Sequence, residues 1–167
     1  STLQKSCMRY DSCQRYLNIY SKNTKVCNLL ILKSEDDDEK ISGRSLIWTL
    51  KDGSIFMDRI YYTNDSDVEI FKEYARSKGW YYKNAQNSIH DEMLESKDGP
   101  YTGDIEVQLE FAEFSDYPYM DTLKYIDTGS GILSNDPMSN SFSSALEETE
   151  GGIPGENCEE CGGSGTV

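Results

Sequence analysis

The strongest constraint on the fold is a block of three apolar runs within residues 26–62. The runs at 26–32, 41–50 and 54–62 have strand length and are rich in branched and aromatic side chains. Five consecutive acids, residues 35–39, separate the first two runs, and their mutual repulsion predicts a solvated loop. Asp52-Gly53 separates the last two, as expected of a tight turn between antiparallel strands. We therefore predict a three-stranded antiparallel meander whose first strand is buried.

Two helices are predicted to flank the meander. Residues 6–23 carry an apolar stripe at helical spacing, formed by Cys13, Tyr16, Leu17 and Tyr20. A second helix is predicted to be capped by Ser66 or Asp67 and to run to about residue 78, with Gly79 just past its end. Its predicted buried stripe consists of Val68, Phe71, Tyr74 and Ala75.

Further strands are predicted at 80–82, 104–114 and 119–126, where aromatic or alternating apolar residues recur. The fold class is then α+β, with a central, mostly antiparallel mixed sheet of about five to seven strands flanked by helices. After Lys124 the chain has no Lys or Arg and is rich in Ser, Gly and Asn. We predict a folded body over residues 1–126 and an acidic C-terminal tail over 127–167. The absence of an initiator Met fits a body that lacks part of its native N-terminus.

The net charge of −14, from 30 acidic and 16 basic residues, narrows the classes of partner. Binding to phosphate backbones or anionic lipid requires clustered Lys and Arg, so direct nucleic-acid binding is not expected. No apolar run of about 18 residues is present, so no membrane span is expected either. The charge is compatible with solubility alone, with a basic protein partner, or with mimicry of a nucleic acid.

The five cysteines do not resemble a secreted disulfide framework, because their number is odd and their spacing uneven. Cys158 and Cys161 form a C-x-x-C turn followed by glycines, the arrangement of a zinc knuckle. Cys7 and Cys13 could complete a tetrahedral zinc site, and His90 is another candidate ligand. The alternatives are a tail with two free thiols and, less favoured by the flanking acids, a redox pair.

A second candidate site lies within the predicted sheet. Asp58 and Arg59 are adjacent in the third strand, so strand alternation points them to opposite faces. Arg44 on the neighbouring strand could form a cross-strand ion pair with Asp58. Alternatively Arg44, Asp58, Arg59 and Tyr61 form the polar floor of a small pocket.

The predicted element order over residues 11–126 resembles that of GCN5-related acetyltransferases (GNAT). In that family the loop before the central helix carries glycines whose amides bind the pyrophosphate of coenzyme A. Here residues 63–67 read Thr-Asn-Asp-Ser-Asp, with no glycine and with two carboxylates that would repel pyrophosphate. The resemblance therefore implies the fold, while coenzyme A and acyl transfer are not expected to come with it.

Four strings also resemble an uncharacterised protein family of tailed bacteriophages and prophages. They are SCMR at 6–9, GRSLIW at 43–48, FMDRIY at 56–61 and YPYMDTLKY at 117–125. The resemblance implies a viral protein located in the host bacterial cytoplasm or in the virion. It implies no activity, and the leading hypothesis is an accessory or virion-associated protein that binds another protein without catalysis. An acyltransferase-like enzyme and an acidic nucleic-acid mimic that inhibits a host defence system are the alternatives.

Overall fold

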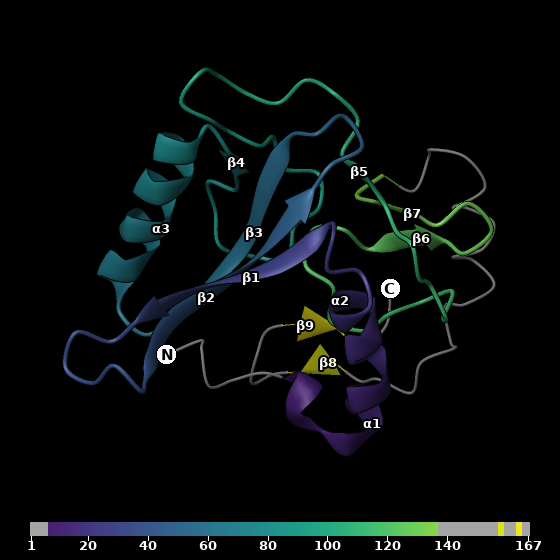
Figure 1. Ribbon diagram of the computed structural model, residues 1–167, viewed down its shortest axis with the longest axis horizontal. Helices are drawn as coiled ribbons and strands as arrows, with labels where there is room; N and C mark the ends of the chain where they lie inside the picture. Colours follow the sequence, from purple (N-terminus) through teal and green to yellow (C-terminus); the bar gives the residue numbers. More distant parts are fainter. Residues whose placement is uncertain (1–6, 137–156, 159–162, 165–167) are drawn as a thin grey trace.

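The computed structural model describes residues 7–136, 157–158 and 163–164. Its centre is a four-stranded sheet in the order β1 (Cys27–Lys33), β2 (Ile41–Thr49), β3 (Ile55–Tyr62) and β4 (Tyr81–Tyr82). The first three strands pair antiparallel, which confirms the predicted meander. β4 pairs parallel with β3, and such a pair needs a crossover, which α3 (Asp65–Lys78) provides (Figure 1).

The helix α3 covers one face of this sheet. Its N-cap is Asn64, at least two residues before the predicted cap, Ser66 or Asp67. It ends at Gly79, whose φ of 72° is the left-handed conformation expected there. Phe71 and Ala75 are buried, whereas Tyr74, predicted to be buried with them, is 41% exposed. Gly43 of β2 allows the helix to approach closely, because a Cβ at this position would lie 2.6 Å from the Phe71 ring.

The other face of the sheet is covered in part by the N-terminal segment. This segment alternates between 3₁₀ and α geometry, as η1 (Cys7–Arg9), α1 (Asp11–Gln14), η2 (Arg15–Leu17) and α2 (Asn18–Ser21). The predicted N-terminal helix is therefore found as an uninterrupted helical segment over residues 11–21, but its geometry is mixed. Its buried residues, Cys13, Tyr16 and Ile19, recur every third position, which is the repeat of a 3₁₀ turn and not of a regular α-helix.

A second sheet packs beside the first in the order β5 (Glu106–Gln108), β7 (Ile132–Ser134) and β6 (Tyr125–Asp127), all antiparallel. Its strands are shorter than predicted. After β5 the backbone N–H groups no longer bond to a neighbouring strand, because the Asn23 side chain replaces it. The Asn23 side-chain oxygen accepts from the N–H groups of Glu110 and Phe111, both at 2.9 Å. β7 is buried at the centre of this sheet, although it lies beyond residue 126, where the acidic tail is predicted to begin.

The α+β class is confirmed, but a single sheet of about five to seven strands is not found in the described part of the chain. Its strands form one sheet of four, one of three, and a pair made by β8 (Asn157–Cys158) and β9 (Gly163–Ser164). The larger hydrophobic core joins the two sheets. Trp48 and Phe56 from the first pack into one cluster with Val107 and Leu133 from the second.

Candidate functional site

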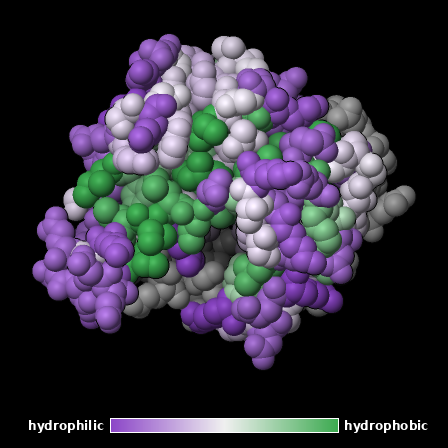
Figure 2. Space-filling view, viewed as in Figure 1, coloured by the Kyte–Doolittle hydropathy of each residue, from purple (hydrophilic) through white to green (hydrophobic). Residues whose placement is uncertain are grey.

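The strand β1 forms one edge of the four-stranded sheet and has only β2 as a described neighbour. Its prediction as a buried strand is wrong. Leu30 and Leu32 pack against the cluster beneath α3, but Leu29 and Ile31 on the opposite face are 56% and 42% exposed. Figure 2 shows a hydrophobic surface that extends over β1 and toward α3, next to the hydrophilic loop that follows β1. An exposed apolar edge strand offers side chains and backbone groups with which another chain can pair, so β1 is a candidate interaction site.

The backbone groups of β1 that face away from β2 can be assigned from one hydrogen bond. The N–H of Thr49 donates to the carbonyl of Val26 at 2.8 Å. Because hydrogen-bonded positions alternate in an antiparallel ladder, Asn28 and Leu30 also bond toward β2. The N–H and C=O groups of Leu29 and Ile31 therefore point to the edge at which no described strand pairs with β1. The residues with exposed side chains are also those with outward-facing backbone groups.

An acidic loop, residues 34–40, follows directly on β1. It is closed by the Ser34 N–H, which donates to the Lys40 carbonyl at 2.9 Å. Lys40 forms an ion pair with Asp37 at 3.4 Å. Four further carboxylates are exposed, and none of them has an ion-pair partner in the described part of the chain: Glu35, Asp36, Asp38 and Glu39. The end of β1, at Lys33, therefore lies next to a loop of net negative charge.

The four residues predicted as a polar floor, Arg44, Asp58, Arg59 and Tyr61, lie on the adjacent strands β2 and β3, but the predicted ion pair between Arg44 and Asp58 is not formed in the described residues. Instead the Arg44 guanidinium lies 5.4 Å from the centre of the Tyr61 ring. The partner of Arg59 and Tyr61 is Asp121, which accepts from the Arg59 guanidinium at 3.3 Å and from the Tyr61 hydroxyl at 2.7 Å.

A second set of polar contacts surrounds Asp58. Its carboxylate accepts from the Thr122 hydroxyl at 2.7 Å, and Thr122 in turn accepts from the ammonium of Lys83 at 2.9 Å. Lys83 also donates to the carbonyls of Asn87 and Ile89, at 2.7 and 2.8 Å. All three ammonium hydrogens are used, so this buried lysine anchors a loop to the sheet and presents no free amine.

Burial controls the ionisation of this polar network. It raises the pKa of Asp121 to about 6, and the nearby Asp58 charge acts in the same direction. Burial also lowers the pKa of Lys83, although the negative charges of Asp58 and Asp121 oppose this effect. The pKa of Tyr61 is raised by burial and by the charge of Asp121. Sequence reasoning missed Asp121, Thr122 and Lys83, since they lie far along the chain from β2 and β3.

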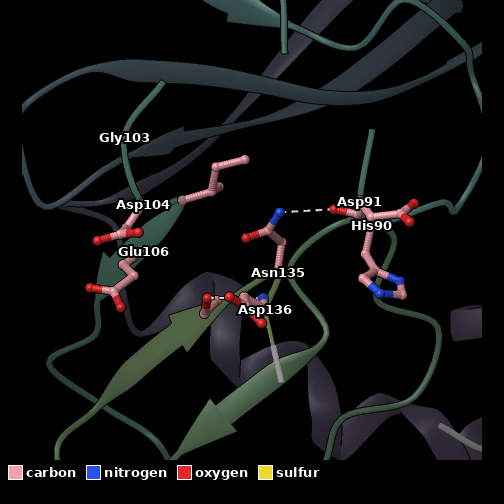
Figure 3. Close-up of a pocket in the computed structure, with 9 residues that line it drawn as sticks. His90, Asp91, Gly103, Asp104, Glu106, Asn135 and Asp136 are labelled. Carbon is pink, nitrogen blue, oxygen red and sulfur yellow. Dashed lines mark hydrogen bonds between the residues drawn. The ribbon is translucent and has the colours of Figure 1, made fainter. Parts of the chain in front are cut away.

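A cleft of about 330 Å³ lies beside the second sheet. In Figure 3, Asp104 and Glu106 are on one side of it and His90 and Asp91 on the other, with Asn135 between them. The Asn135 amide donates to the His90 carbonyl at 2.9 Å. The acidic side chains are spread around the rim, and no group of three or more potential metal ligands occurs in the described part of the chain. His90, a candidate zinc ligand, packs edge-on against Tyr125 with ring centres 5.5 Å apart.

The predicted zinc ligands are described only in part. Cys13 is buried, and its sulfur lies 3.9 Å from the Ser12 hydroxyl. Cys161 and the side chains of Cys7 and Cys158 lie outside the described residues. The backbone of β8 pairs antiparallel with β9, which places Cys158 opposite Gly163.

The N-terminus of α3 is capped by side chains of the chain itself. The Asp67 carboxylate accepts from the Asn64 N–H at 3.0 Å and from the Ser42 hydroxyl at 2.6 Å. A buried carboxylate at this position opposes an incoming phosphate group.

Comparison with protein-family models, curated proteins and solved structures found no match to this chain. None of the helices in the described ranges is long and apolar enough to cross a membrane.

Proposed function

We propose that this chain is a non-catalytic protein-binding module and that its partner docks on the edge strand β1. The observation that carries this proposal is the coincidence of exposed side chains and open backbone groups at Leu29 and Ile31. Sheet edges are normally shortened, charged, interrupted by proline or covered. Here the only irregularity is a bulge between Leu32 and Lys33, at the far end of the strand. The rest of β1 is suited to the addition of a partner strand.

The polar network supports a role without catalysis. A catalytic lysine or carboxylate needs a free atom that faces a substrate. The ammonium of Lys83 is fully used by Asn87, Ile89 and Thr122, and Asp121 is held by both Arg59 and Tyr61. These contacts join segments that are distant in the sequence, so the network stabilises the fold.

A GNAT-like fold is part of the proposal. The order β3, α3, β4 with a parallel β3–β4 pair supports it. Acyl transfer from coenzyme A does not follow, because Asp67 occupies the helix N-terminus that would bind the pyrophosphate.

A phage or prophage origin rests on the resemblance of the four strings GRSLIW, FMDRIY, YPYMDTLKY and SCMR. With this origin, we propose that the protein acts in the host bacterial cytoplasm or in the virion and binds a phage or host protein. A nucleic-acid mimic would need an acidic docking face, whereas the open edge of β1 is apolar, so protein binding has the better support.

A structural zinc ion bound by Cys158 and Cys161, with Cys7 and Cys13 as further ligands, remains part of the proposal. The pairing of Cys158 with Gly163 supports it, because these two short strands flank the C-x-x-C sequence and a zinc knuckle is built on such a sequence.

Affinity capture from infected cells tests the proposed function. The bait is the full chain, compared with Ile31→Pro, which removes an outward N–H that β2 does not use. Ile31→Thr keeps the β-branched shape and removes the apolar surface. Ile70→Thr is the matched control, since Ile70 is 46% exposed on α3. We expect a protein that the wild-type and Ile70→Thr chains retain and both Ile31 variants lose. A partner retained equally by all four chains contradicts β1 as the docking site.

A further inference from the structure

We infer that the partner segment is an extended strand that alternates apolar and basic residues, with its basic side chains against the acidic loop 34–40. This inference rests on the proposed function and specifies the chemistry of the segment that β1 binds.

The alternation follows from the geometry of the open edge. Leu29 and Ile31 are two residues apart, so their side chains lie on the same face of the sheet. A strand paired with them places every second side chain on that face, about 5 Å from its cross-strand neighbour. Apolar residues at those positions would cover the exposed parts of Leu29 and Ile31.

The basic character follows from the charge at the end of β1. A strand that pairs past Ile31 reaches Lys33 and then the loop, which begins at Ser34. The loop carries four exposed carboxylates that have no ion-pair partner among the described residues, whereas Asp37 is paired with Lys40. Lysine or arginine in the added strand would compensate this charge, whereas acidic residues would be repelled.

The same charge argues against two other occupants. A second copy of this chain would bring a further net charge of −14 to the interface. A nucleic acid would bring phosphates to the acidic loop, and it has no backbone amides with which to extend the sheet.

A synthetic peptide of about eight residues that alternates valine and lysine is a suitable probe. Its binding to the full-length chain is measured by isothermal titration calorimetry. One comparison peptide has glutamate in place of lysine. The other has the valine–lysine sequence with N-methyl groups on alternate amides, which keeps its charge but removes the hydrogen bonds of a β-ladder.

Two protein variants distinguish the effect of the loop's negative charges from the effect of the chain's overall negative charge. The loop variant replaces the four exposed acids with their amides: Glu35→Gln, Asp36→Asn, Asp38→Asn and Glu39→Gln. The control removes the same charge from exposed positions outside β1 and its loop: Asp11→Asn, Glu73→Gln, Glu95→Gln and Asp98→Asn. Circular dichroism and thermal unfolding confirm that both variants fold.

We expect the valine–lysine peptide to bind at least about tenfold more tightly than either comparison peptide. We expect the loop variant to lose about tenfold in affinity for it and the control variant to lose less than about threefold. Equal binding of the N-methylated peptide would overturn strand addition. Equal losses in the two variants would overturn the role of the loop. A wild-type dimer that Ile31→Pro dissociates in sedimentation would identify a second copy as the occupant and also overturn the inference.

The inference can fail while the proposed function holds. This would be the outcome if the captured partner is lost in the Ile31 variants but the chain shows no preference for the valine–lysine peptide. Peptide binding that Ile31→Pro leaves unchanged would contradict both.

Discussion

Tyr61 of β3 donates its hydroxyl to the carboxylate of Asp121 at 2.7 Å, although 60 positions separate the two residues in sequence. Arg59 donates to the same carboxylate at 3.3 Å. This contact ties the segment before β6 to the central sheet, on the face opposite α3. It also gives the chain a buried acid whose ionisation is coupled to folding.

The stability of the chain is predicted to fall as the pH rises through the range in which Asp121 ionises. The pKa of Asp121 is about 6 in the folded chain, above its ordinary value of 3.8. Between these values the folded chain holds a proton on Asp121 that the unfolded chain has released. The contribution of this proton to the free energy of unfolding is therefore present at pH 4 and lost above pH 6. At roughly 1.4 kcal/mol per pKa unit, the loss is at most about 3 kcal/mol.

Urea unfolding between pH 4 and pH 7 measures this effect. The difference in the free energy of unfolding between wild type and Asp121→Asn should change across the window by up to about 3 kcal/mol. Tyr61→Phe removes a hydrogen bond that lowers the Asp121 pKa and should shift the midpoint upward. A difference that is constant with pH would show that Asp121 titrates normally.

Replacement of Lys83 is predicted to be severely destabilising. Lys83→Met leaves the carbonyls of Asn87 and Ile89 and the Thr122 hydroxyl without their donor, at a cost of about 3 kcal/mol. Lys72→Met is the control, because Lys72 donates to the Asn84 carbonyl at an exposed site and should lose less than about 0.5 kcal/mol. Similar losses for the two variants in urea unfolding would contradict the role of the buried network.

The close approach of α3 predicts a specific effect at Gly43. In Gly43→Ala the new Cβ lies 2.6 Å from the Phe71 ring, and overpacking of this kind costs about 1–3 kcal/mol. Phe71→Leu should relieve the clash, so the double variant should be more stable than the sum of the two single losses indicates. Strict additivity would mean that the helix moves away instead.

The C-x-x-C element predicts bound zinc in the purified protein. We expect about one equivalent per chain by elemental analysis, and its loss in the Cys158→Ser, Cys161→Ser double variant. Less than about half an equivalent in wild type would reject the site.

Local sequence signals predicted the features of the fold that depend on neighbouring residues. Asp52-Gly53 specifies a turn through its own backbone preferences, and Gly79 ends α3 for the same reason. The three runs of the meander could thus be predicted from the sequence without knowledge of the rest of the chain.

The position of β1 at the edge could not be predicted in this way. A continuous apolar run is typical of a strand covered on both faces, and periodicity does not indicate which strands become neighbours. For the same reason, only part of the candidate polar site could be predicted from the sequence. Arg44, Asp58, Arg59 and Tyr61 were identified from the predicted meander, whereas Asp121 and Lys83 reach it only through the tertiary fold.

Amide hydrogen exchange in β1, resolved by residue with NMR, tests the central claim most directly. In the free full-length chain, the Leu29 and Ile31 amides should exchange at least about 100-fold faster than the Leu30 amide, which bonds to β2. Addition of the captured partner should slow Leu29 and Ile31 and leave Leu30 unchanged. If Leu29 and Ile31 are already as protected as Leu30 in the free chain, or stay unprotected in the complex, β1 is not the docking strand.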